Sequence, residues 1–233
     1  MNTVKLGIAG LGHVGCGLVD LVQRQENLRL PGKVEITGVT ARNRGRNRPV
    51  DTDAYRWFDD AARLAADDSV DVFVELIGGS DGPAKVAVET AIKAGKSVVT
   101  ANKALIAMHG QELAKLARDN GVDLLFEAAV AGGVPIVRVL RDSLAGVEIK
   151  RVTGILNGTC NFLLSEMLDT GKPYETVLAE AQRLGYAEAD PTLDVSGMDA
   201  AHKAAILAAI AFSADLDFSK VAVSGVEGIE LLD

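Results

Sequence analysis

The chain has 233 residues, of which 48% are hydrophobic, and its formal net charge is -8 at pH 7. This apolar content is enough for a sizeable core in one α/β domain or in two smaller ones. The negative charge disfavours non-specific binding to nucleic acid, and the basic cluster ARNRGRNR at 41–48 is too short to follow a phosphate backbone. We therefore expect no nucleic-acid partner.

The cysteines and the N-terminus indicate the compartment. Cys16 and Cys160 are not at a metal-ligand spacing, and we expect both to be reduced thiols. The chain enters a strand-like run, VKLGIAG, without the basic start and long apolar stretch of a targeting segment. No later apolar run approaches the roughly 18 residues of a membrane span. These features predict a soluble, cytoplasmic protein without a membrane partner.

Short apolar runs alternate with segments of helical periodicity over the first part of the chain. Strands are predicted at 4–9, 34–39, 70–76, 97–100 and 123–127, and helices at 14–23, 83–94 and 104–120. Strands and helices that alternate at this spacing predict an α/β fold with a parallel, doubly wound sheet and right-handed crossovers, as in a Rossmann-type domain.

The pattern changes near residue 133, where we place a domain boundary. The dinucleotide-binding domain would be 1–133, and a smaller α+β substrate-binding and dimerisation domain would be 134–233. In the second domain we predict a helix at 134–146, a strand at 148–156, then mostly helices, and a final strand and turn at 220–233. Because one or two strands make a poor independent sheet, we expect that the chain is a fragment or completes its sheet with a partner subunit, as in a homodimer.

A glycine-rich turn, GLGHVG, stands between the first predicted strand and the first predicted helix. In the dinucleotide fingerprint the first glycine (Gly10) makes the turn, the second (Gly12) admits the pyrophosphate and the third (Gly15) lets the helix pack on the strand. The helix N-terminus then supplies amide donors to the phosphates. A purely structural turn is the alternative, but the strand-turn-helix context favours dinucleotide binding.

The end of the second predicted strand bears on the choice between NAD and NADP. An acid would hold the ribose 2′-hydroxyl of NAD there, but this chain has Thr40, Ala41 and Arg42. Arg42 can pair with a 2′-phosphate through two parallel hydrogen bonds. A solvated basic loop is the alternative, and we predict that NADP(H) is preferred over NAD(H).

Asp199 and Lys203 lie four positions apart in DAAHKAAILAAIAF, an apolar helical pattern. This spacing puts both side chains on one face of the helix. A surface salt bridge would look the same, but the apolar surroundings favour a lysine at a cleft. Such a lysine can exchange a proton with an alcohol or stabilise an oxyanion that forms on a carbonyl.

Further polar residues precede this helix or begin another. Glu188, Asp190 and Asp194 lie in GYAEADPTLD, where an acid can cap a helix or bind a substrate ammonium group; for Asp190 we favour the cap. Lys103 follows the fourth predicted sheet strand, at the carboxyl end where open α/β sheets bind ligands. An ordinary surface lysine is its alternative. The predicted substrate is amino-acid-like, with an alcohol or aldehyde.

With these residues assembled, the whole chain resembles the homoserine dehydrogenase family. The matching motifs, in the family's order, are GLGHVG, VELIGG at 74–79, GKSVVTANKAL at 95–105, EAAVAGGVPI at 127–136, GILNGTCNFLL at 154–164 and GYAEADPTLDVSGMDAAHK at 185–203. The resemblance implies NAD(P)-dependent interconversion of L-aspartate 4-semialdehyde and L-homoserine, in the pathway toward threonine, methionine and isoleucine. It also implies further sequence after residue 233.

The resemblance implies a role for particular residues. Lys203 would be the catalytic acid/base, supported by Asp199. The substrate would be bound by Lys103, Gly158, Thr159, Tyr186, Glu188 and Asp194. We place the cofactor against Gly10, Gly12, His13, Val14, Gly15, Arg42, Gly78 and Thr100. A monovalent cation, sodium, would be held by Glu127 and by the carbonyls of Val130, Gly132 and Val134.

Two rival functions stay open. A phosphorylating semialdehyde dehydrogenase would need a catalytic cysteine, and Cys160 is the candidate, although we favour a small packing residue there. Alternatively, the chain would be a dinucleotide-binding regulatory or interaction module without turnover.

Overall fold

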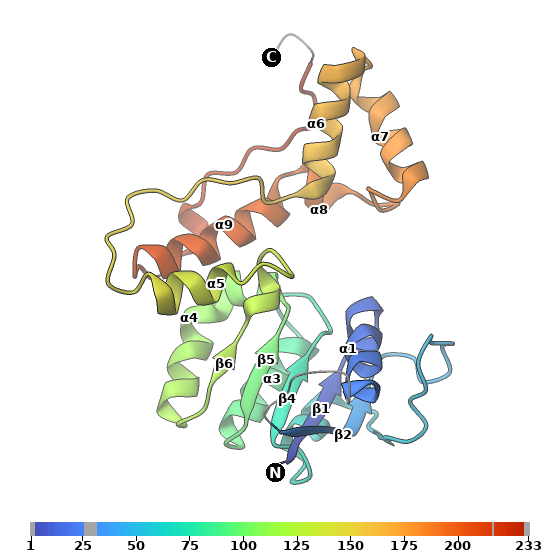
Figure 1. Ribbon diagram of the computed structural model, residues 1–233, viewed down its shortest axis with the longest axis vertical. Helices are drawn as coiled ribbons and strands as arrows, with labels where there is room; N and C mark the ends of the chain where they lie inside the picture. Colours follow the sequence, from blue (N-terminus) through green and yellow to red (C-terminus); the bar gives the residue numbers. More distant parts are fainter. Residues whose placement is uncertain (1–2, 26–31, 216, 231–233) are drawn as a thin grey trace. The chain divides into compact units, whose positions relative to one another are not determined.

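The computed structural model describes residues 3–25, 32–215 and 217–230 (Figure 1). The chain divides into two compact units, Met1–Arg138 and Val139–Asp233, which we call unit 1 and unit 2 and describe separately. The predicted boundary after residue 133 lies slightly before this division and stays a prediction.

Unit 1 is built on a parallel sheet of six strands in the order β3-β2-β1-β4-β5-β6. The strands are β1 (Thr3–Ala9), β2 (Lys33–Thr40), β3 (Arg56–Trp57), β4 (Val72–Glu75), β5 (Ser97–Thr100) and β6 (Leu124–Leu125). The central strand β1 pairs with β2 and β4, and the chain crosses from one half of the sheet to the other between them. The predicted α/β, doubly wound fold is confirmed, and its switch point lies beside β1.

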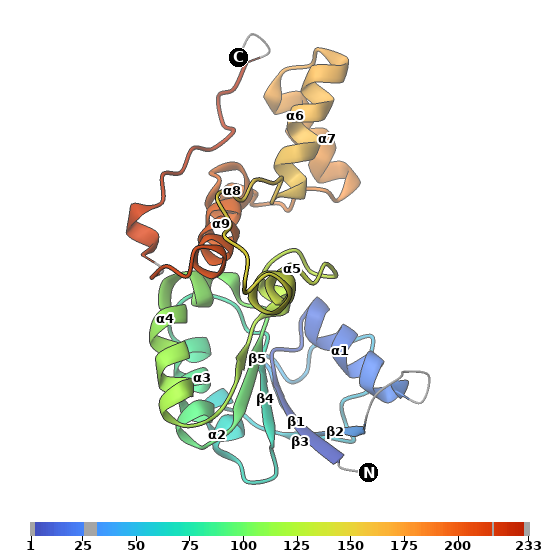
Figure 2. The same ribbon diagram turned by 60° about the vertical axis from the view of Figure 1, so that its left-hand side comes forward.

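Helices cover both faces of this sheet. Helix α1 (His13–Gln23) packs on one face, and α2 (Ala61–Ala66), α3 (Pro83–Lys93) and α4 (Lys103–Asp119) cover the other (Figure 2). On the α1 side Val19 packs with the strand residues Ile8 and Val39, all fully buried. On the opposite side Phe73 of β4 packs with Leu105 of α4. Burial on both faces explains why the buried parts of the strands, such as LGIA in β1 and FV in β4, are apolar.

Side chains at the helix ends explain where two of these helices begin. The carboxylate of Asp60 accepts the backbone N–H of Arg63 at 2.9 Å, and the amide oxygen of Asn102 accepts the N–H of Leu105 at 3.1 Å. Both satisfy donors that a helix N-terminus leaves without partners. Helix α3 instead begins with Pro83, whose missing N–H costs nothing at that position. The sequence predictions missed α2 and β3, the two short elements between β2 and β4.

The described regular structure of unit 2 is helical. Its α-helices are α6 (Gly158–Thr170), α7 (Tyr174–Leu184), α8 (Thr192–Val195) and α9 (Met198–Ala211). Helices α6 and α7 pack side by side through a buried cluster that includes Leu163, Met167 and Val177. Each ends at a glycine in the left-handed conformation, Gly171 and Gly185, where a residue with a side chain would be strained.

Two predicted strands of this unit were wrong. Residues 148–156 form no strand and have no regular secondary structure. The described part of 220–233 contains the end of a 3₁₀ turn (Phe218–Lys220) and coil, and 231–233 lie outside the described residues. A strand needs a neighbour, and the described residues of unit 2 supply none. The helix predicted at 134–146 is divided between α5 (Ile136–Arg138) in unit 1 and a π-helical turn (Val139–Ser143) in unit 2.

Among the described residues, no helix combines the length and the apolar character that crossing a membrane would require.

Candidate active site

The glycine turn before α1 has one glycine for each of three different requirements. Gly10 has φ +106°, and a Cβ there would lie 2.2 Å from the carbonyl oxygen of Leu76. A Cβ on Gly15 would lie 1.9 Å from the carbonyl oxygen of Gly10, so helix and turn touch through backbone alone. Gly12 has nothing within 4 Å of its Cβ position. The first and third glycines are required by packing, whereas the second leaves space for a ligand.

A pocket of about 490 Å³ opens beside this turn. Its walls are the residues around Gly12 and His13 at the start of α1 and the segment 46–50 that follows β2. Val14 is 57% exposed in the first turn of the same helix. Arg42 lies on the exposed loop directly after β2, and Arg46 of the same loop lines the pocket. The backbone donors at the helix N-terminus and these guanidinium groups suit a phosphate-bearing ligand.

The carboxyl ends of β4 and β5 are joined by a buried carboxylate that the sequence predictions missed. Glu75 is fully buried, and its Oε1 accepts the backbone N–H groups of Ile77 and Gly78 at 2.7 and 3.1 Å. Its Oε2 accepts the hydroxyl of Thr100 at 2.6 Å. Glu75 thereby fixes the turn that carries Gly78, at the sheet edge where parallel sheets bind ligands. An acid that ends an apolar strand was the available signal.

Lys203 and Asp199 form a close, poorly solvated ion pair on α9. The Nζ of Lys203 donates to Asp199 Oδ2 at 2.6 Å and to the carbonyl oxygen of Leu156 at 2.8 Å. The side chains of Lys203 and Asp199 are 20% and 5% exposed. The alternative of a surface salt bridge is therefore wrong. Two of the three ammonium donors are used, so one can still serve a substrate oxygen.

Asn157 joins this pair to a second carboxylate, and no sequence prediction included it. Its side-chain amide donates to Asp194 Oδ1 at 2.7 Å and to Asp199 Oδ2 at 2.9 Å. Its Oδ1 accepts the backbone N–H of Cys160 at 2.7 Å, which caps α6. Since every polar atom of the amide is used, one asparagine orients two acids of different helices. Its place before Gly158 in LNGT, at a helix start, was the signal.

Thr159 supports the second carboxylate. Its hydroxyl lies 2.9 Å from Asp194 Oδ2 and 2.9 Å from the carbonyl oxygen of Tyr186, and it can donate its single hydrogen to only one of them at a time. The surrounding pocket has a volume of about 640 Å³. Of the predicted site residues it brings together Gly158, Thr159, Tyr186, Asp194, Asp199 and Lys203.

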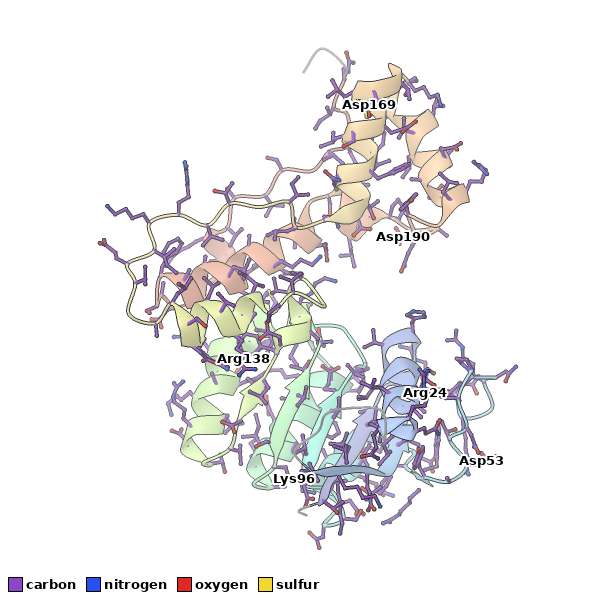
Figure 3. All side chains as sticks on the ribbon, viewed as in Figure 1. Arg24, Asp53, Lys96, Arg138, Asp169 and Asp190 are labelled. Carbon is purple, nitrogen blue, oxygen red and sulfur yellow. The ribbon has the colours of Figure 1, made fainter. Side chains whose placement is uncertain are left out.

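Three other polar predictions fall outside this pocket lining. Asp190, in the connection from α7 to α8 (Figure 3), accepts the hydroxyl and the N–H of Thr192 at 2.6 and 3.2 Å. These hydrogen bonds hold the pKa of the Asp190 carboxyl below its usual value. The N-cap of α8 is Pro191, without a side-chain cap, so Asp190 closes a turn before the helix and does not form the predicted cap. Glu188 is exposed nearby. Lys103 begins α4 in unit 1, so its role stays a prediction.

The environment of Cys160 argues against a catalytic thiolate. Its Sγ lies 3.2 Å from the carbonyl oxygen of Asp194, to which the thiol donates. Burial raises the pKa of the Cys160 thiol, and the carboxylates of Asp194 and Asp199 raise it further. A nucleophilic cysteine requires the opposite shift. The interpretation as a packing residue is therefore favoured over a phosphorylating dehydrogenase.

A different lysine also has a perturbed environment. Burial lowers the pKa of Lys96, although the charges of Asp67, Asp68 and Asp71 oppose the shift. Its ammonium group donates to the carbonyl oxygen of Asp67. Lys96 lies just before β5, at the amino end of that strand (Figure 3), away from the edge where parallel sheets bind ligands. We assign it a structural role.

The residues of the predicted cation site supply suitable oxygens. Glu127 accepts the backbone N–H groups of Val137 and Arg138 at 3.0 and 2.9 Å, one with each carboxylate oxygen. Each oxygen keeps a lone pair for a cation. The nearby carbonyls belong to a tight turn in which Ala131 and Gly133 have positive φ. Hard oxygen donors of this kind fit a monovalent cation. Among the described residues, no group of three or more His, Cys, Asp or Glu residues could hold a metal.

The fold and the two pockets define a nucleotide-dependent oxidoreductase architecture, in which one unit has the dinucleotide fingerprint and the other a lysine–carboxylate pocket. Comparison with known proteins is more specific. The family model for the homoserine dehydrogenase NAD-binding domain matches residues 10–127, and the homoserine dehydrogenase model matches residues 135–233. The chain belongs to the homoserine dehydrogenase family.

Individual relatives agree. Homoserine dehydrogenase of Pseudomonas aeruginosa is 47% identical over 100% of this chain and 54% of the relative, and that of Corynebacterium glutamicum is 46% identical over 100% of this chain and 52% of the relative. The chain thus spans about half the length of the curated relatives it matches. The crystal structure of a Thiobacillus denitrificans homoserine dehydrogenase has a TM-score of 0.90 at 41% identity, over 100% of this chain and 54% of that one. A hyperthermophilic archaeal homoserine dehydrogenase in complex with NADPH has a TM-score of 0.84 at 27% identity, over 99% and 76% of the two chains.

Proposed function

We propose that this chain carries the catalytic residues for the NAD(P)H-dependent interconversion of L-aspartate 4-semialdehyde and L-homoserine, in threonine, methionine and isoleucine biosynthesis. The observation that carries the proposal is the pair formed by Lys203 and Asp199, held with Asn157 in the pocket of unit 2. The reaction is inferred from membership in the family, and Lys203 of this pair is the proton donor that the reaction needs.

Lys203 acts on the oxygen of the reacting carbon. The bound cofactor supplies the hydride, and reduction of the aldehyde leaves negative charge on its oxygen. Lys203 has one ammonium donor left beside its bonds to Asp199 and Leu156, and it aims this donor at the developing oxyanion. It then gives the proton to the alkoxide, and it takes the proton back in the direction of homoserine oxidation. Asp199 accepts a hydrogen bond from the lysine and holds it in place.

The remaining carboxylates bind the amino-acid part of the substrate. Asp194 is held by Asn157 and Thr159, and its negative charge suits the substrate ammonium group. Glu188 lies on the exposed connection before α8 and is assigned to the same group, while Lys103 of unit 1 is assigned to the substrate by family resemblance. Fixing a substrate from several sides aligns its aldehyde carbon for transfer.

The test is NADPH oxidation with L-aspartate 4-semialdehyde. It is measured for this chain and for a longer protein that contains this chain and has the full length of its relatives. Turnover that requires no phosphate supports the proposal. NADPH binding without turnover in both proteins would replace it with a binding module, and a requirement for phosphate would indicate a phosphorylating dehydrogenase. Turnover in the longer protein alone would show that this reaction needs residues beyond the 233 of this chain.

We further propose that NADP(H) is preferred, with Arg42 as a partner of the 2′-phosphate. Arg42→Met should raise the Kd for NADPH by about tenfold, the worth of a charge-assisted hydrogen bond, and change the Kd for NADH less than twofold. Arg118→Met, on the exposed end of α4, removes the same charge elsewhere in unit 1 and is the matched control. Fluorescence titration measures both constants. Equal affinities of the unsubstituted protein for NADH and NADPH would contradict the preference.

Three further assignments complete the proposal. Glu127 and the carbonyls of Val130, Gly132 and Val134 would hold a sodium ion that supports their turn; the hydrogen-bonded carboxylate of Glu127 favours this assignment. The protein would be cytoplasmic. It would also be a homodimer, since segment 148–156, which has the composition of a strand, has no strand partner among the described residues of its unit. Light scattering at micromolar concentration tests the dimer.

A further inference from the structure

The basic loop after β2 is organised by one of its own arginines. The guanidinium of Arg48 donates three hydrogen bonds to backbone carbonyls of the same loop: from Nη2 to Asn43 at 2.5 Å, and from Nη1 to Arg44 at 3.1 Å and to Arg46 at 3.0 Å. A single side chain thus gathers three carbonyls that would otherwise face water. The loop from Asn43 to Arg48 is closed around this group.

Trp57 of β3 fixes the other side of the same guanidinium. The Cζ of Arg48 lies 5.5 Å from the centre of the Trp57 ring, and that of Arg44 lies 5.6 Å from the same centre. Both are within the range of a cation–π contact. Arg48 is half-buried, while Arg44 is exposed. The indole of a sheet residue therefore anchors the loop to unit 1 through Arg48.

The four arginines of this loop consequently have different roles. Arg44 and Arg48 are engaged with Trp57, whereas Arg42 and Arg46 are exposed and form no ion pair among the described residues. Arg46 lines the pocket beside the glycine turn, and its carbonyl is one of those that Arg48 holds. Arg48 thus fixes the backbone conformation of the loop at Arg46, and this conformation determines where the guanidinium of Arg46 lies in the pocket.

A planar fork is needed for this arrangement. Nη1 and Nη2 donate to different carbonyls while the Cζ of the guanidinium lies over the indole, 5.5 Å from the ring centre. A lysine ammonium is a point charge without a face, and it cannot make the two kinds of contact in one geometry. The contacts at position 48 therefore require the guanidinium group of an arginine, and a positive charge alone is not sufficient.

We propose that Arg48 is a positioning residue for cofactor discrimination, which pre-organises the loop 42–48 so that Arg42 and Arg46 meet the 2′-phosphate of NADP(H). The inference rests on the proposed preference for NADP(H), and it adds a structural cause for that preference, the ordering of the loop by Arg48. Ordering the loop before binding removes an entropy cost that the cofactor would otherwise meet. Arg48 also lines the pocket beside the glycine turn, but its guanidinium is engaged with the loop carbonyls and with Trp57, so we assign it no contact with the cofactor.

The experiment compares two nucleotides that differ by one phosphate, adenosine 2′,5′-bisphosphate and adenosine 5′-monophosphate, so that no turnover is required. Calorimetry gives the ratio of the Kd of the monophosphate to the Kd of the bisphosphate, for the unsubstituted chain and for Arg48→Met, whose aliphatic side chain can still cover Trp57. The ratio should fall roughly tenfold in Arg48→Met, with the Kd of the monophosphate changed less than twofold. Arg48→Lys should give nearly the same loss.

Arg44→Met is the matched control, because it removes the same charge from the same indole, whereas the Arg44 side chain donates to no backbone carbonyl in the described part of the chain. An equal loss in Arg44→Met would overturn the inference in favour of general loop charge. An equal weakening of both nucleotides by Arg48→Met, or retained discrimination, would also overturn it. If the unsubstituted chain itself fails to discriminate, the proposed NADP(H) preference fails first; if it discriminates and Arg48→Met still does, only the role of Arg48 fails.

Discussion

Replacing Lys203 with methionine should lower the turnover of L-aspartate 4-semialdehyde by about 10³-fold, the usual worth of a positioned proton donor that also stabilises an oxyanion. The Nζ of Lys203 contacts Asp199 and the carbonyl of Leu156 at the pocket of unit 2, and methionine keeps the aliphatic stem but offers no proton. Binding of NADPH should be unchanged, since the dinucleotide fingerprint lies in unit 1. Steady-state rates and fluorescence titration measure the two quantities.

Two controls separate chemistry from stability in this prediction. Methionine removes the ammonium group from a buried ion pair, which should cost roughly 3–5 kcal/mol of unfolding free energy. The double variant Lys203→Met/Asp199→Asn also removes the carboxylate of that pair and should regain stability without regaining turnover. Lys220→Met, at an 81% exposed lysine of the same unit, should change neither. Turnover within tenfold of the unsubstituted protein in folded Lys203→Met would contradict the acid/base role.

The sheet of unit 1 could be predicted because its signals are local. The long strands contain apolar residues that are buried on both faces of the sheet, and helices such as α3 and α4 are followed by Gly95 and Gly121, where the chain turns with positive φ. The elements that were missed, β3 and α2, are two and six residues long. Neither is long enough for a hydrophobic period to show.

The strand predictions in unit 2 depended on something that local sequence does not contain. Segment 148–156 has the composition of a strand, but a strand forms only when a neighbour satisfies its backbone. Among the described residues of unit 2 no such neighbour is present. A pattern can indicate the preference of a segment, while pairing decides the outcome.

The active-site predictions divide in the same way. Asp199 and Lys203 are four positions apart on one helix, so their pairing follows from helical geometry. Asn157 lies 37 and 42 positions from the two acids it joins, and only the packing of α6 against α8 and α9 brings them together. Glu75 shows a related limit. The apolar residues before it indicated a buried strand, but not which backbone N–H groups would donate hydrogen bonds to its carboxylate.

Replacing Gly10 with alanine should lower the free energy of unfolding by about 3 kcal/mol or more, because alanine is strained at positive φ and its methyl group would overlap backbone. Gly10 has φ +106°, and a Cβ there would lie 2.2 Å from the carbonyl oxygen of Leu76. That carbonyl belongs to the turn after β4, so relief would require moving the junction of β1 with β4. Urea unfolding monitored by circular dichroism measures the loss.

Gly12→Ala is the matched control for Gly10→Ala, because nothing lies within 4 Å of its Cβ position and its φ of -78° suits any residue. It should change stability by less than about 1 kcal/mol but weaken NADPH binding at least tenfold, since the added methyl group occupies the space that a pyrophosphate needs. The two glycines thereby separate the folding requirement of the turn from its binding requirement. Full NADPH affinity in Gly12→Ala would show that the cofactor does not approach this backbone, and the assignment of the pocket beside α1 would then be wrong.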